Sequence, residues 1–287
     1  MSTQKLPDFD SLWDYSDPEA TEIKFREMLQ QIPTSESAHL ELLTQIARAQ
    51  GLQRKFEEAH QTLDMVEKEL IENSRVQVRY CLERGRVFNS SKQADKAKSY
   101  FEQALELAKA LGKDFYAVDA IHMLAIIADP ASALTLNLGA IQLAESSSDE
   151  RARGWLGSLY NNTGWSYHDM GKYESALEIF EKAEAFRRSK GSASEIRIAT
   201  WCVARTLRSL NQIEEALSKQ LELEKEFKAA GETDGYVFEE IGECLLALNR
   251  KEESRAYFAK AYEILSGDAW LVEEEAERLK RLQELGS

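Results

Sequence analysis

The pattern of apolar and polar positions is helical along almost the whole chain. No run of alternating Val, Ile and Thr residues, which would be typical of strands, interrupts it. Three of the four prolines lie within the first 33 residues, and after Thr34 only Pro130 remains. Because proline breaks helices and is so rare in this long stretch, the sequence predicts an all-α fold.

One pattern of large, small and aromatic residues recurs six times. Its clearest copy has Gly164 as the small residue of a first helix, followed by Ala176, Phe180 and Ala183 on a second helix. The small residue returns every 38 to 40 positions, at Ala47, Gly85, Ala125, Gly164, Ala204 and Gly242. The central residue of the second helix is Leu63, Phe101, Asn137, Phe180, Gln220 or Phe258. Small residues let the two helices of a hairpin approach, and large ones fill the space to the next hairpin, so the hairpins should stack.

This pattern resembles the tetratricopeptide repeat. The resemblance covers residues 40–266 and implies an α-α solenoid, in which helical hairpins form a right-handed superhelix. The period near 39 exceeds the family's usual 34, so each hairpin should carry about one extra helical turn. The third repeat departs from the pattern, with a turn at Asp129-Pro130-Ala131 that is four residues shorter.

Both ends of the chain are expected to cap the stack. The predicted organisation is an N-terminal segment with a capping helix in 1–37, six repeats in 38–266, and a capping helix in 267–287. The first cap should begin with a capping box at Ser16–Glu19. Its helix carries Thr21, Phe25 and Met28, which fit the second helix of a missing hairpin. In the last helix, about 268–285, the apolar residues Trp270, Leu271, Leu279 and Leu282 share one side.

The charge balance excludes several classes of partner. The chain has 50 acidic against 36 basic residues, a net charge of −14. Phosphate binding needs a basic surface, so nucleic acid is not expected as a partner, and neither is an anionic membrane. The chain has neither a membrane-spanning apolar run nor a secretory signal, which predicts a cytoplasmic protein. The three cysteines are widely spaced and should be reduced thiols, with Cys202 the one that could be reachable.

No catalytic or metal-binding motif is present. The four histidines show no pair at metal-ligand spacing, and no phosphate-binding loop or nucleophile motif occurs. The prediction is therefore a protein that is not an enzyme and has neither a cofactor nor a metal. An enzyme or an enzyme subunit remains a minor alternative.

The resemblance also implies where a ligand would lie, because in this family the first helices line the concave surface. Ten residues at or near inward-facing positions form the predicted peptide-binding set: Arg48, Arg79, Arg86, His122, Asn161, Trp165, His168, Trp201, Arg205 and Arg208. The first helices contain seven arginines and no lysine, although the chain has 18 of each. Arginine suits carboxylate recognition, so an acidic or C-terminal segment is the predicted ligand. Alternatively, arginine merely packs better on crowded inner helices.

The set divides into three predicted subsites. Arg48, Arg79 and Arg86 would bind an anionic group. A central cluster would combine Asn161, which can bind a peptide backbone, with the flat rings of Trp165 and Trp201 as an anchor. His168 would belong to the same cluster, with His122 on the preceding hairpin. Arg205 and Arg208 would lie beyond the anchor. The alternative interpretation is that the tryptophans and the two histidines are packing residues.

The leading hypothesis is thus an adaptor that binds a protein or peptide in its concave groove. A self-associating scaffold is the alternative, and exposed Trp13, Tyr15 or Trp270 would favour it. The oligomeric state is left open, as is whether the groove is filled by the chain's own N-terminal segment.

Overall fold

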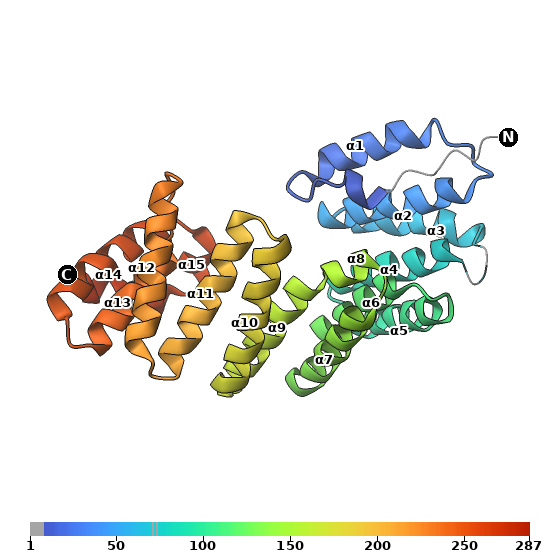
Figure 1. Cartoon of the computed structure of the whole chain (residues 1–287). Helices are drawn as coiled ribbons and strands as arrows, with labels where there is room; N and C mark the ends of the chain where they lie inside the picture. Colours follow the sequence, from blue (N-terminus) through green and yellow to red (C-terminus); the bar gives the residue numbers. More distant parts are fainter. Residues whose placement is uncertain (1–8, 71, 73) are drawn as a thin grey trace. The chain divides into compact units, whose positions relative to one another are not determined.

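The structure is a computed structural model that describes residues 9–70, 72 and 74–287 (Figure 1). Every regular element in these residues is a helix, which confirms the all-α prediction. The chain divides into two compact units, an N-terminal unit, Met1–Leu159, and a C-terminal unit, Tyr160–Ser287.

Helical hairpins make up most of the N-terminal unit. Its elements are η1 (Phe9–Leu12), α1 (Pro18–Leu29), α2 (Ser37–Leu52), α3 (Phe56–Lys68), α4 (Arg75–Ser90), α5 (Ala94–Ala110), α6 (Asp114–Ile127), α7 (Pro130–Ser146) and α8 (Glu150–Gly154). Helices α2 and α3, α4 and α5, and α6 and α7 pair as hairpins (Figure 1). The short helix α8 was not predicted, because it lies between two copies of the repeat pattern.

Helix α1 differs in one detail from the predicted capping box. Its N-cap is Asp17, whose Oδ1 accepts a hydrogen bond from the Ala20 backbone N at 2.9 Å. Ser16 instead donates to Asp14. The buried face carries Thr21 and Phe25, whereas Met28 is partly buried.

The C-terminal unit continues with further hairpins. Its elements are α9 (Leu156–Asp169), which spans the boundary between the units, then α10 (Tyr173–Lys190), α11 (Ala193–Ser209), α12 (Ile213–Ala229), α13 (Gly235–Ala247), α14 (Lys251–Leu265), α15 (Ala269–Glu274) and α16 (Ala276–Leu285). The last two replace the single helix expected after residue 267, because the backbone leaves helical geometry at Glu275. Leu271, Leu279 and Leu282 are buried as predicted, but Trp270 is 58% exposed and does not belong to the packed side.

The small residues of the first helices are in contact with the large residues of the second helices, as predicted. A β-carbon on Gly85, Gly164 or Gly242 would lie 2.5, 2.5 or 2.9 Å from the facing ring of Phe101, Phe180 or Phe258. Each of these rings is fully buried. The other three repeats have alanine as the small residue, and their facing residue is not aromatic. The glycines therefore provide the space that a phenylalanine ring needs between the helices.

The turns inside the hairpins follow the same register. Seven residues after the small residue, five hairpins place a residue with a positive φ of 60–70°: Arg54, Lys92, Gly171, Asn211 and Asn249. The third hairpin has no such residue, because only residues 128 and 129 join α6 to α7. Asp129 there accepts hydrogen bonds from the backbone N atoms of Ala131 and Ser132, both at 3.1 Å, and Pro130 opens the helix. This confirms the shorter turn of the third repeat.

Candidate functional site

Arg79, one of the three arginines predicted to bind an anion, is buried and paired within the N-terminal unit. It extends from α4, is 3% exposed, and contacts Glu41 at 2.9 Å and Asp10 at 2.6 Å. Its Nε also donates to the hydroxyl of Tyr116 at 2.9 Å. The charge of Arg79 is therefore already balanced by carboxylates of the chain itself.

Arg48 and Arg86 come together on a shared carboxylate. Arg86 Nη1 lies 2.7 Å from Glu83 Oε1, and Arg48 Nη1 lies 3.5 Å from the same oxygen. Arg86 also contacts Asp119 at 2.5 Å. Binding of a partner by these arginines stays a prediction, and a partner would have to replace carboxylates that are already in place.

His122 lies in the N-terminal unit, whereas the rest of the predicted central cluster lies in the C-terminal unit. Its ring is 5.2 Å from that of Trp155, and its Nδ1 is buried with no hydrogen-bond partner among the described residues. Burial lowers the pKa of His122 below 6.5, against a smaller opposing effect of Asp119. The imidazole is therefore neutral at pH 7.

Among the other four residues of the predicted central cluster, the two tryptophans and His168 pack together, and Asn161 lies beside Cys202. Trp165 on α9 packs against Trp201 on α11, with ring centroids 6.0 Å apart, and against His168 at 5.1 Å. Asn161 Oδ1 lies 3.6 Å from Cys202 Sγ on α11. The four side chains are intermediate in exposure, which fits both an anchor and partial packing.

Cys202 is not reachable, contrary to the sequence-based expectation. All three cysteines are buried, and Cys202 is 2% exposed. Burial raises the pKa of the Cys202 thiol to about 12. The residue thus behaves as a small packing side chain.

An open pocket lies beside Trp201 in the C-terminal unit. We call it the Trp201 pocket; it has a volume of about 240 Å³ and is lined by Arg197, Ile198, Trp201, Phe227, Asp234, Tyr236 and Val237. Most of the lining is apolar. Ile198 is 56% exposed, and Tyr236 lies with its ring centroid 6.3 Å from that of Trp201.

Two side chains of the Trp201 pocket carry buried donors without a partner. Among the described residues, Trp201 Nε1 and Arg197 Nε have no hydrogen-bond acceptor. The guanidinium of Arg197 lies 4.2 Å from the ring centroid of Phe227, and its Nη1 is 3.0 Å from Glu232 Oε2. A buried donor without an acceptor costs about 1–3 kcal/mol.

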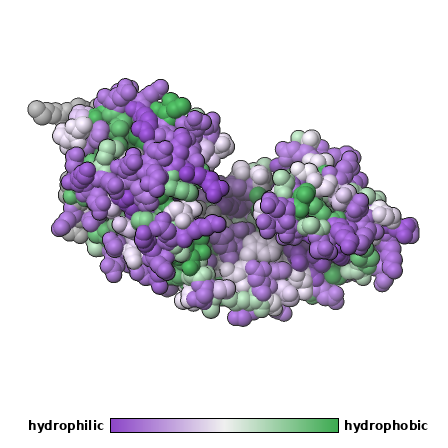
Figure 2. All heavy atoms as spheres, turned by 180° about the vertical axis from the view of Figure 1, so that it is seen from behind, coloured by the Kyte–Doolittle hydropathy of each residue, from purple (hydrophilic) through white to green (hydrophobic). Residues whose placement is uncertain are grey.

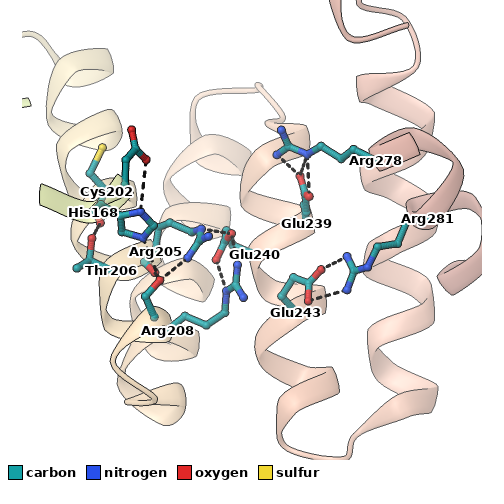
Figure 3. A network of polar contacts seen from close by, with 12 residues as sticks. His168, Cys202, Arg205, Thr206, Arg208, Glu239, Glu240, Glu243, Arg278 and Arg281 are labelled. Carbon is teal, nitrogen blue, oxygen red and sulfur yellow. Dashed lines mark hydrogen bonds and ion pairs between the residues drawn. The ribbon is translucent and has the colours of Figure 1, made fainter. Parts of the chain in front are cut away.

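Arg205 and Arg208 share one buried carboxylate on α13 (Figure 3). Arg205 Nε lies 3.0 Å from Glu240 Oε1, and Arg208 Nε lies 2.7 Å from Oε2. Arg205 also donates to Ser209 at 2.6 Å, and Ser209 lies 2.9 Å from His168 Nε2. Two guanidiniums on one carboxylate leave one net positive charge. Burial lowers the pKa of Arg205, Glu240 opposes this, and the neighbouring Arg208 lowers it further.

Two more arginines of this network are paired with carboxylates, and one of them, Arg278, also lies 3.7 Å from Glu275 Oε2. Arg278 on α16 contacts Glu239 at 2.6 Å, and Arg281 contacts Glu243 (Figure 3). Counted over the whole network, four arginines face four glutamates, and only the group of Arg205, Arg208 and Glu240 holds more guanidiniums than carboxylates.

The carboxylate partners of the arginines were missed in the sequence, although a signal for them exists. Glu83 and Glu240 each lie two residues before the small residue of their repeat, and 35 residues after Arg48 and Arg205. In these two repeats, the arginine one residue after the small residue thus meets a glutamate of the next hairpin. Ile198 and Tyr236 were likewise not singled out, because nothing in the sequence shows that a pocket opens between them.

The exposed surface gives no single large apolar area on the side shown in Figure 2, where hydrophilic side chains predominate. Of the aromatic residues named for self-association, Tyr15 and Trp270 are exposed, whereas Trp13 is partly buried. Self-association stays a prediction.

None of the described helices is long and apolar enough to cross a membrane. In the described part of the chain, no group of three or more His, Cys, Asp or Glu side chains could hold a metal ion.

Comparison with known sequences supports the repeat pattern. The sequence profile of the tetratricopeptide repeat matches residues 78–111, 157–189 and 237–264. These segments contain the three repeats with a glycine facing a phenylalanine. A search of curated proteins finds no match.

Several solved structures share the fold. The apo form of RapI superposes with a TM-score of 0.72 at 12% identity, over 89% of this chain and 73% of that chain. A signal transduction ATPase with a tetratricopeptide repeat sensor, from Pyrococcus horikoshii, has a TM-score of 0.72 at 14% identity, over 92% of this chain and 43% of its own. NprR in complex with its cognate peptide NprX has a TM-score of 0.52 at 16% identity, over 96% of this chain and 81% of that chain. The chain thus contains tetratricopeptide repeats in these three segments, and it shares the fold of tetratricopeptide repeat proteins, with a small residue that returns every 38 to 40 positions.

Proposed function

We propose that the chain is a non-enzymatic adaptor that binds a peptide segment of a partner protein through its C-terminal unit. The observation that carries this proposal is the Trp201 pocket, an open and mostly apolar recess lined by Ile198, Trp201 and Tyr236 among others. Its volume of about 240 Å³ lies below the roughly 300–1,000 Å³ of small-molecule sites. A pocket of this size suits a single apolar side chain of a peptide.

The charge next to the pocket defines the second feature of the ligand. Arg205 follows Trp201 by four residues on α11, which places the two side chains on the same face, about 6 Å apart. The net positive charge shared by Arg205 and Arg208 would attract a carboxylate there. An extended chain rises about 3.3 Å per residue, so that carboxylate belongs about two residues from the apolar anchor.

The proposed ligand is therefore an extended segment with one apolar residue and an acidic side chain, or the C-terminal carboxylate, about two residues away. Trp165 and Asn161 would contact the segment beside the pocket. The complex of NprR with a peptide supports the proposal, because a protein of the same fold holds a peptide.

A peptide selection tests the proposal. A random peptide library displayed on phage is selected on the full chain, and the enriched peptides are titrated against purified variants. The Ile198→Glu variant places a carboxylate at the mouth of the pocket and should weaken binding by about ten-fold or more. The double variant Trp165→Ala/Trp201→Ala should lose binding altogether.

The control variant is Ile23→Glu, on α1 of the other unit, because Ile23 is exposed to the same degree as Ile198, 55% against 56%. It should bind the enriched peptides as wild type does. If Ile198→Glu and Trp165→Ala/Trp201→Ala bind every enriched peptide as tightly as wild type, the proposal is wrong.

A further inference from the structure

The chain's own segment Phe9–Tyr15 covers the predicted arginine subsite of the N-terminal unit. Asp10 on η1 contacts Arg79 of α4 at 2.6 Å and also contacts Arg151 of α8. Phe9 beside it is 1% exposed. The segment therefore lies where the sequence placed an external acidic ligand.

The aromatic residues of the segment are held by side chains of α2. Trp13 Nε1 donates to Gln45 Oε1 at 3.0 Å, and the Trp13 ring stacks on that of Tyr15, with centroids 4.9 Å apart and planes 8° from parallel. The guanidinium of Arg48 lies 5.5 Å from the Trp13 ring and 5.3 Å from the Tyr15 ring. Gln45 itself is fully buried. Carboxylate, indole and phenol are thus each recognised by a specific partner.

Asp10 supplies one of the two carboxylates that face three arginines in its surroundings. Three guanidiniums, of Arg75, Arg79 and Arg151, face the carboxylates of Glu41 and Asp10. Without Asp10 they would share one carboxylate, although Arg79 is 3% exposed. Because a buried charge without a partner is costly, an anionic group is needed at this position.

Asp10 is ionised at neutral pH. Burial raises its pKa, but Arg79 and Arg151 lower it more, so that the pKa lies below 3.8. The contact is therefore a charged one under physiological conditions.

We infer that this face is a binding site for an acidic, aromatic peptide segment, which the chain fills with its own residues 9–15. A partner segment with a carboxylate three residues before a tryptophan would displace them. The site is separate from the Trp201 pocket, which lies in the other unit. Because the internal segment is tethered, a partner competes with a high effective concentration, and binding is regulated by how easily the segment leaves.

A titration with the segment itself tests the inference. The probe is a fluorescein-labelled peptide of residues 9–16, FDSLWDYS. The full chain with Asp10→Asn/Trp13→Ala has a weakened internal competitor, so it should bind the probe about ten-fold or more tightly than wild type does. A probe that carries the same two substitutions should not bind.

Two further variants place the probe on this face. Added to the double variant, Arg151→Gln should weaken probe binding about ten-fold, because it removes a charged contact. Arg153→Gln on the same helix α8 is the matched control, since Arg153 contacts Glu150 and Ser147 and not the segment. It should leave the affinity unchanged. If the folded double variant does not bind the probe, residues 9–15 are a permanent part of the fold and the inference is wrong.

A second measurement, on the unaltered chain, tests the same inference even if the double variant does not fold. An isotopically labelled FDSLWDYS peptide is added in excess, and amide hydrogen exchange of the chain's own residues 9–16 is followed by mass spectrometry. Displacement should speed their exchange about ten-fold or more. Exchange that does not change at any peptide concentration contradicts the inference.

Discussion

A β-carbon on Gly164 would lie 2.5 Å from the ring of Phe180, well inside the contact distance of two carbon atoms. The ring is fully buried between α9 and α10, so it cannot move away without disturbing its neighbours. Gly164→Ala should therefore destabilise the chain by about 1–3 kcal/mol, measured by urea unfolding.

Gly139→Ala is the control for that substitution. Gly139 lies within α7 and an added β-carbon would meet no atom within 4 Å, so alanine should stabilise the chain by about 0.5–1 kcal/mol. Equal effects of the two substitutions would show that helix propensity, and not the Phe180 contact, determines the choice of glycine.

The turn residue Lys92 should be replaceable by glycine with a gain in stability. Its φ is 63°, a left-handed conformation that costs a residue with a side chain about 1–2 kcal/mol. Lys92→Gly should raise the free energy of unfolding by up to about 1 kcal/mol, after the greater entropy of glycine in the unfolded chain is included. At the equivalent position of the fourth hairpin, Gly171 has a φ of 70°, and Gly171→Ala should have the opposite effect in the same urea titration. Destabilisation by Lys92→Gly would contradict this account.

The repeat could be predicted from the sequence because its determinants are local. The spacing of Gly85, Gly164 and Gly242 is visible in one dimension, and so is the short turn at Asp129. The boundary helix α8 was not visible, because five residues carry too little periodicity. The internal pairing of Asp10 with Arg79 joins residues 69 positions apart, and no repeat rule connects η1 to α4.

Whether a predicted site residue is free or already paired depends on neighbours in space that the sequence does not show. Arg48 and Arg86 were expected to be free for an anion, but Glu83 lies between them. The aromatic cluster of Trp165 and Trp201 was expected from the repeat frame, and the structure brings these rings together. Whether these residues bind a peptide is not decided by position alone, because a packed and an exposed tryptophan occupy the same place in the repeat.

Replacing Gln220 with an apolar residue should stabilise the chain. It is fully buried where other repeats have phenylalanine, and neither Nε2 nor Oε1 has a hydrogen-bond partner among the described residues. Gln220→Leu should stabilise the chain by about 1–3 kcal/mol, because it removes two buried polar atoms that lack partners. The exposed Gln142→Leu serves as control and should change stability by less than about 0.5 kcal/mol. A loss of stability with Gln220→Leu would indicate that its amide has a partner in solution.

Stability should fall as the pH drops below neutrality. Burial lowers the pKa of His168, Arg205 and Arg208 lower it further, and Asp169 opposes them in part. The unfolded chain then binds a proton near its ordinary pKa of 6.5 while the folded chain does not. The stability from this group is complete above that value and is lost as the pH falls through it towards the lower pKa of the folded state. His60 and His122 contribute in the same direction.

Urea unfolding at about pH 7.5 and about pH 5 measures this loss. The difference should be smaller in His168→Gln, which has no proton to gain. An equal difference in wild type and His168→Gln would show that His168 titrates normally in the folded chain.

The most direct test of the central claim is the indole N–H resonance of Trp201 in the intact chain during a titration with a peptide enriched by phage selection. The five tryptophan signals, resolved by nitrogen-15 labelling, are assigned with single Trp→Phe variants. If the Trp201 pocket holds the peptide, the Trp201 signal moves to saturation, because the peptide packs against the indole that lines the pocket, while the exposed Trp270 keeps its position. A Trp201 signal that does not move when the peptide is fully bound would contradict the account.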